Sequence, residues 1–134
     1  MSKNRPIRRE TADRLLQGLQ QRILEINSDD SYAFVVERAV VFGSYVNTDR
    51  DILGDLDIGV LLSDRFGDDE TVQDMAEERA RGRYRGKRWV EEVIWPQTEI
   101  LRYLRNGSPH ISIHNIGTED DEAIFSKKTI ELNV

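Results

Sequence analysis

Apolar and polar residues in the first half of the chain follow a pattern that predicts one long helix and then two strands. Over residues 9–26, apolar residues recur at helical spacing with Arg, Gln and Glu between them, which predicts an amphipathic helix. The Val-rich run 37–42, which could begin as early as Tyr32, predicts a strand. Residues 55–62 alternate, which predicts a second strand with one apolar face. That face would consist of Leu56, Ile58, Val60 and Leu62.

Helical patterns follow in the second half of the chain. After a loop at residues 63–69, the spacing of apolar residues predicts a helix over residues 70–81. Apolar pairs four residues apart predict a helical turn over residues 89–95. Pro96 suits the first position of a new helix, which the Asn106-Gly107 pair would end.

The end of the chain predicts one or two more strands. Residues 110–116 alternate and predict a strand, residues 118–122 read as an acidic turn, and residues 129–134 predict either an edge strand or a frayed tail. The element order predicts a small α+β fold, a two-layer α/β arrangement, in one domain spanning residues 1–134. Residues 1–8 and 119–134 are its candidate flexible ends.

Composition narrows the class of protein. The 134 residues suit one domain with one core, and the absence of Cys excludes disulfides, thiolate metal sites and a Cys nucleophile. No apolar run approaches membrane-spanning length, and no apolar segment follows the basic residues 1–10, so we expect a cytoplasmic protein without a signal peptide. The net charge of −6 argues against general coating of nucleic acid but leaves room for a local basic patch.

Two aspartates open the second predicted strand. Asp55 and Asp57 are two residues apart, so their carboxylates leave the same face of a strand. Two such charges repel each other unless a cation lies between them, and Mg²⁺ prefers oxygen ligands together with substrate phosphates. The pair therefore suggests half of a Mg²⁺–nucleotide site. The alternative is a solvated strand end, which is the more common meaning of an isolated D-x-D.

A Gly-Ser pair lies upstream, directly after the first strand. Gly43 would let the backbone approach a ligand closely, and Ser44, with the free N–H groups of a helical turn, could bind phosphate oxygens. The alternative is an ordinary turn between a strand and a loop. Because a strand, this pair, ten residues and D-x-D follow one another, the sequence suggests a phosphate cradle beside a metal site.

The stretch VVFGSYVNTDRDILGDLDIGVLL, residues 40–62, resembles the signature of the DNA polymerase β-type nucleotidyltransferase superfamily. The Gly-Ser-x10-Asp-x-Asp spacing is similar to that of minimal nucleotidyltransferases, small proteins paired with HEPN partners in toxin–antitoxin modules. The resemblance implies a small mixed β-sheet flanked by helices and transfer of a nucleoside monophosphate from an NTP, with ATP the expected one, to a hydroxyl, releasing pyrophosphate. It also implies Mg²⁺ binding by Asp55 and Asp57 and triphosphate contacts at Gly43 and Ser44.

The chain departs from that family at the third carboxylate, which should lie on the strand at residues 110–116. This strand, HISIHNI, has no Asp or Glu, and Ser112 and His114 share the face opposite its isoleucines. His114 is the best candidate to face Asp57, as a general base or weak metal ligand; the alternative is a strand histidine bonded to a neighbour. A carboxylate could also come from elsewhere, and the sequence does not choose among Glu91, Glu92, Glu99, Glu119, Asp120 and Asp121.

A basic segment, RARGRYRGKR at residues 79–88, concentrates positive charge in an acidic protein. It could hold a triphosphate or the phosphates of an RNA acceptor, with Tyr84 stacking on a base; the alternative is a solvated connector. It is no P-loop, because the upstream Gly and the following Ser or Thr are missing.

Three functions remain open at this point. The first is a nucleotidyltransferase whose acceptor surface comes from a partner protein, a second copy of the chain or the acceptor itself, with a partner toxin as one such acceptor. The second is a catalytically degenerate binding module of the same fold, which the missing carboxylate favours. The third is a nucleic-acid-binding domain that uses residues 79–88, against which the net charge of −6 counts.

Overall fold

The computed structural model describes residues 6–67, 70, 73–75, 77–78, 89–117 and 121–134, with the backbone alone over 89–96. The described part of the predicted helix 70–81, namely residues 70, 73–75 and 77–78, is helical. The basic segment 79–88 and residues 118–120 lie outside the described residues.

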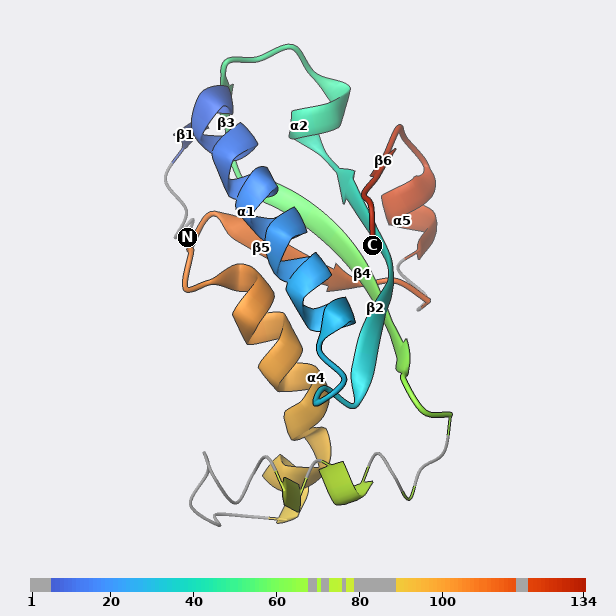
Figure 1. Cartoon of the computed structure of the whole chain (residues 1–134). Coiled ribbons are helices and arrows are strands. Elements are labelled where there is room, and N and C mark those ends of the chain that lie inside the picture. The colour runs from blue at the N-terminus through green and yellow to red at the C-terminus, as the bar shows by residue number, and fades with distance from the viewer. Residues whose placement is uncertain (1–5, 68–69, 71–72, 76, 79–88, 118–120) are drawn as a thin grey trace.

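A four-stranded mixed sheet forms the centre of the fold (Figure 1). Its strands are β2 (Phe34–Phe42), β4 (Leu56–Asp64), β5 (Ile111–Asn115) and β6 (Ile130–Glu131), in the order β5-β4-β2-β6. β4 runs parallel to β5, whereas β2 is antiparallel to both β4 and β6. With helices on both faces of this sheet, the molecule has the predicted α+β architecture (Figure 1).

The connection between the two central strands carries its own short elements. α2 (Ser44–Asn47) follows β2 at once, and β3 (Ile52–Leu53) precedes β4. β3 pairs with β1 (Ile7–Arg8) in a separate two-stranded sheet, in the register Ile7↔Leu53. The N-terminal end of the chain is thereby tied to the connection that contains the predicted site.

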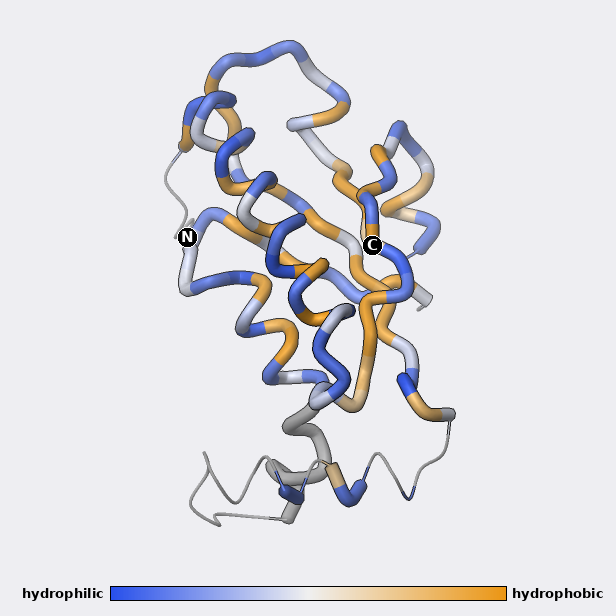
Figure 2. Tube along the Cα trace, in the orientation of Figure 1, coloured by the Kyte–Doolittle hydropathy of each residue, from blue (hydrophilic) through white to orange (hydrophobic). Residues whose placement is uncertain are grey.

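Two long helices cover one face of the sheet. α1 (Arg9–Ser28) and α4 (Trp89–Arg105) lie side by side on it (Figure 1), and hydropathy alternates along α1 (Figure 2). β2 is apolar apart from Glu37 and Arg38 in its middle. Burial of apolar surface between these layers is the main source of stability. The fully buried large side chains of this core include Leu19, Ile23, Ile26, Leu56, Ile58, Ile100, Leu104 and Ile111.

The opposite face has a smaller cover, α5 (Asp121–Phe125). Val40 from β2 packs there with Ile116 and Ile124. A Cβ at Gly59 would come within 3.1 Å of both Val40 and Ile116, so Gly59 lies on this face. The predicted alternation of β4 is therefore confirmed: Leu56, Ile58 and Val60 belong to the large core and their neighbours to the other face.

Two predictions about helices were wrong. α4 runs from Trp89 through Pro96 without a break, so Pro96 does not begin a new helix. A proline removes one N–H from the helix ladder, and a helix with enough tertiary contacts can continue past it. Of the predicted acidic turn at residues 118–122, the described part, Asp121 onward, is the short helix α5.

The alternatives at the C-terminus are resolved as an edge strand. β6 pairs with β2 through Ile130 and Glu131, opposite Val41 and Val40. Two atoms of the Arg38 guanidinium donate to the carboxylate of Glu131, at 2.5 Å for the shorter contact with Oε2. Over the described residues, no helix combines the length and apolar character needed to span a bilayer.

Candidate functional site

The Gly-Ser turn and the second aspartate of D-x-D meet where β2 ends. Phe42, the last residue of β2, is paired with Asp57 of β4, so Gly43 follows directly beside the aspartate. Gly43 has φ +80°, and a Cβ at this position would collide with Oδ2 of Asp57. Gly is therefore required twice over, for its backbone conformation and for the close approach of the carboxylate.

Ser44 is the first residue of α2, the single turn that follows. The carbonyl of Gly43 accepts from the N–H groups of Val46 and Asn47, at 3.1 and 3.0 Å. In the first turn of any helix the leading N–H groups have no carbonyl partner within the helix, which here applies to Ser44 and Tyr45. The predicted polar groups of Ser44 are thus presented at the end of the sheet.

The two aspartates interact electrostatically, as their spacing predicts. Asp55 immediately precedes β4, and Asp57 is its second residue and half-buried. The pKa of Asp57 is raised above its ordinary value, mainly because burial disfavours the charged carboxylate. Nearby His114 opposes this rise in pKa, and the negative charge of Asp55 adds to it. The site therefore holds acid groups at an energetic cost that a cation would reduce.

His114 faces Asp57, in the position that alternation along its strand predicts. Its Nε2 lies 3.6 Å from Oδ1 of Asp57 and 3.2 Å from Oγ of Ser112, which is the register partner of Asp57. The imidazole also packs edge-on against Phe42, with 5.1 Å between ring centroids. The position of His114 is confirmed, while its role as a base remains a prediction. His110 lies just before β5, so it falls outside the strand, which was predicted to begin there.

The described residues do not provide a third carboxylate beside these two. β5 carries none, and Oδ1 of Asp121 accepts a hydrogen bond of 2.8 Å from the Gly117 N–H. Glu99 is buried on α4, in the layer that covers the face opposite Asp57. The other candidates fall outside the description, as side chains (Glu91, Glu92) or entirely (Glu119, Asp120). Among the described residues, no group of three or more His, Asp or Glu is arranged to hold a metal ion.

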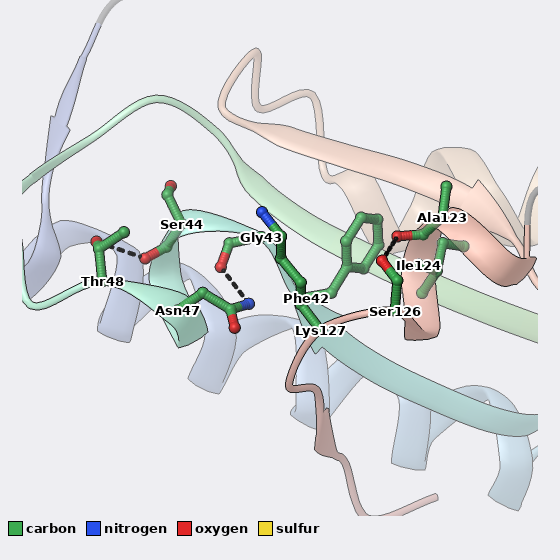
Figure 3. A pocket seen from close by; sticks show the side chains of 9 residues that line it. All are labelled: Phe42, Gly43, Ser44, Asn47, Thr48, Ala123, Ile124, Ser126 and Lys127. Carbon is green, nitrogen blue, oxygen red and sulfur yellow. Dashed lines mark hydrogen bonds between the residues drawn. The ribbon is translucent and has the colours of Figure 1, made fainter.

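A cavity of about 420 Å³ adjoins the Gly-Ser turn (Figure 3). Gly43, Ser44 and Asn47 contribute to one wall. The other wall comes from α5 and the segment after it, through Ala123, Ile124, Ser126 and Lys127. Lys127 is part of that second wall and is not among the site residues predicted from the sequence. The available signal was the Ser-Lys-Lys run at 126–128, but nothing local links that run to Ser44.

The acidic pair fits a magnesium ion, although by itself it does not complete an all-protein site. Asp55 and Asp57 offer the hard oxygen ligands that Mg²⁺ prefers, and Mg²⁺ in nucleotide enzymes takes one or two carboxylates with its remaining positions filled by phosphates and water. The raised pKa of Asp57 records the repulsion and desolvation that such a cation would offset.

Comparison with known proteins found no matching family model, no match among curated proteins and no match among solved structures.

Proposed function

We propose that this protein is a nucleotidyltransferase that moves a nucleoside monophosphate from Mg²⁺–NTP to a hydroxyl acceptor and releases pyrophosphate. One observation carries the proposal: the backbone at Gly43 lies directly against the carboxylate of Asp57. Two motifs that are separate in sequence, a phosphate-binding type of turn and a metal-binding type of acid pair, are thereby adjacent. The resemblance of residues 40–62 to the polymerase β-type signature supports the same activity.

The proposed reaction is a displacement at the α-phosphorus. The acceptor oxygen forms a bond to that phosphorus, the bond to the α–β bridging oxygen breaks, and pyrophosphate leaves with the electron pair. The acceptor proton passes to a base, for which His114 is the candidate because its Nε2 lies beside Asp57. Asp55 and Asp57 would hold Mg²⁺, which neutralises charge on the phosphates when bound.

The acceptor and partner follow from the resemblance. A hydroxyl of a HEPN-type partner toxin is the first acceptor to test, and an RNA end is the second. ATP is the expected nucleotide, and a second copy of the chain is an alternative source of the acceptor surface.

The test is an assay of label transfer from each of the four NTPs to a candidate partner and to RNA, with Mg²⁺ present. We expect Asp55→Asn and Asp57→Asn each to reduce transfer at least about 100-fold, because each removes charge stabilisation in the transition state. Asp64→Asn is the matched control, since Asp64 lies exposed at the far end of the same strand. Equal transfer by wild type and both site variants would remove these aspartates from the mechanism.

A binding module is the second candidate, and one observation favours it. Ser112 and His114 occupy the β5 positions nearest Asp57, where the family has a carboxylate. A protein of this kind would bind its partner equally well as wild type, Asp55→Asn and Asp57→Asn, and would show no transfer. Calorimetric titration of the partner into the same three proteins separates this outcome from the enzyme.

A further inference from the structure

We propose that Lys127 is a further, cationic ligand of the polyphosphate chain expected at the Gly-Ser turn, and that it reaches this chain across the cavity between α2 and the C-terminal segment that contains Lys127. This inference rests on the proposed function in one respect: the chain is taken to be the phosphate tail of the NTP. Inorganic tripolyphosphate has the same chemistry, so binding at this cavity can be measured separately from nucleotide transfer.

The position of the cavity is the first argument. Gly43 and Ser44 line it directly, so it opens at the turn that the proposed function assigns to phosphate binding. On the facing wall, the Lys127 side chain extends across the opening towards these two residues (Figure 3). A volume of about 420 Å³ exceeds the needs of a single phosphate group and is within the usual range of ligand pockets.

The two walls are tied together by one side chain, which is the second argument. The Asn47 amide group donates to the carbonyl of Gly43 and to the carbonyl of Lys128, both at 3.1 Å. Its amide oxygen accepts from the backbone N–H of Lys128, at 3.2 Å. Asn47 thereby fixes the backbone next to Lys127 relative to the Gly-Ser turn, so the two walls of the cavity are joined by direct hydrogen bonds.

The chemistry of the lining is the third argument. Lys127 is the charged residue of the lining, and no carboxylate of the described residues forms an ion pair with it. The hydroxyls of Thr48 and Ser126 donate to carbonyls within their own segments, at 2.8 and 3.2 Å. The Ser44 hydroxyl and the Lys127 ammonium group remain as donors for a ligand, and both suit the oxygens of a phosphate chain.

Titration calorimetry with tripolyphosphate, ATP and adenosine tests the inference on the full chain. We expect Lys127→Gln to weaken tripolyphosphate and ATP by roughly tenfold or more, because a charged hydrogen bond is lost, and Lys127→Arg to retain most of the affinity. Lys128→Gln is the matched control: it removes the same charge one residue away, from a side chain outside the cavity lining. Adenosine should give no more heat than an injection of buffer, since it has no phosphate.

The outcomes separate the pocket from the enzyme. If Lys127→Gln loses tripolyphosphate while wild type transfers no nucleotide, the pocket stands and the transferase fails. If nucleotide transfer depends on Asp55 and Asp57 but ATP and tripolyphosphate bind equally to wild type and Lys127→Gln, the pocket fails and the transferase stands. Equal losses in Lys127→Gln and Lys128→Gln would reduce the effect to net charge and overturn the inference, as would a wild type that does not bind tripolyphosphate.

Discussion

At the scale of single residues, the site depends on the absence of a side chain at Gly43. The residue has φ +80° and ψ −154°, a region that is almost exclusive to glycine. Its Cα hydrogen points at the carboxylate of Asp57, where any larger group would collide. Backbone strain and the steric conflict are separate effects, and the chain offers a way to measure one without the other.

Gly67 provides that comparison. It too has a positive φ, +74°, but a Cβ there would meet no atom of the described residues within 4 Å. Gly67→Ala should therefore cost only the strain of a left-handed residue, about 1–2 kcal/mol in the free energy of unfolding. Gly43→Ala should cost more in urea unfolding, because Asp57 must also move, and it alone should reduce ATP binding. Equal losses of stability with ATP binding intact in both variants would contradict the packing of Gly43 on Asp57.

At the scale of elements, the connection between β2 and β4 is held by the first residue of α1. The Arg9 guanidinium donates from three nitrogens to the carbonyls of Tyr45, Thr48 and Arg50, at 2.8, 2.9 and 2.9 Å. Its Cζ also lies 5.1 Å from the centroid of the Tyr45 ring. One fork-shaped cation therefore satisfies a carbonyl of α2 and two carbonyls that follow it, and it fixes the turn that presents Ser44.

Arg9→Lys tests this arrangement with the charge kept. A lysine has one compact ammonium group, which cannot reach three carbonyls in the same fixed geometry. We expect a loss of about 1–3 kcal/mol in the free energy of unfolding, from carbonyls left unsatisfied, and weaker ATP binding. The matched control is Arg8→Lys, at an exposed position of β1, which should change neither quantity. Chemical denaturation and calorimetry measure both, and identical behaviour of the two variants would contradict the role of Arg9.

The spacing of apolar residues predicted the elements in which buried positions recur at a regular interval. It predicted α1, β2, β4 and β5, and through the alternation of β5 it placed His114 opposite Asp57. It missed α5, because five residues give too little of a helical repeat to detect. It also missed Lys127, whose place beside Ser44 depends on the pairing of β6 with β2 and on the side chain of Asn47. Such non-local contacts leave no periodic signal in the sequence.

At the scale of the whole molecule, the two faces of the sheet are built differently. The face under α1 and α4 is an apolar core, whereas the other combines a small apolar cluster with the acids at one end. Burying an acid without a cation costs free energy, which the core must offset. If the site was selected for binding rather than stability, removing its charge should stabilise the empty protein.

Asp57→Asn tests whether the charge of this carboxylate lowers the stability of the fold, and the raised pKa of Asp57 predicts the direction of the change. A raised pKa means that the charged carboxylate is less favourable in the folded protein than in the unfolded chain, so its charge lowers stability at neutral pH. The free energy of unfolding of the neutral Asn variant should therefore be about 0.5–2 kcal/mol higher than that of the wild type at neutral pH. That advantage should shrink as the pH falls through the raised pKa, because Asp57 of the wild type then becomes protonated in the folded state.

Asp64→Asn, the exposed control on the same strand, should stay within about 0.5 kcal/mol of the wild type throughout. Urea unfolding over a series of pH values measures these differences, and an Asp57→Asn variant that is less stable than wild type at neutral pH would show that the carboxylate stabilises the fold.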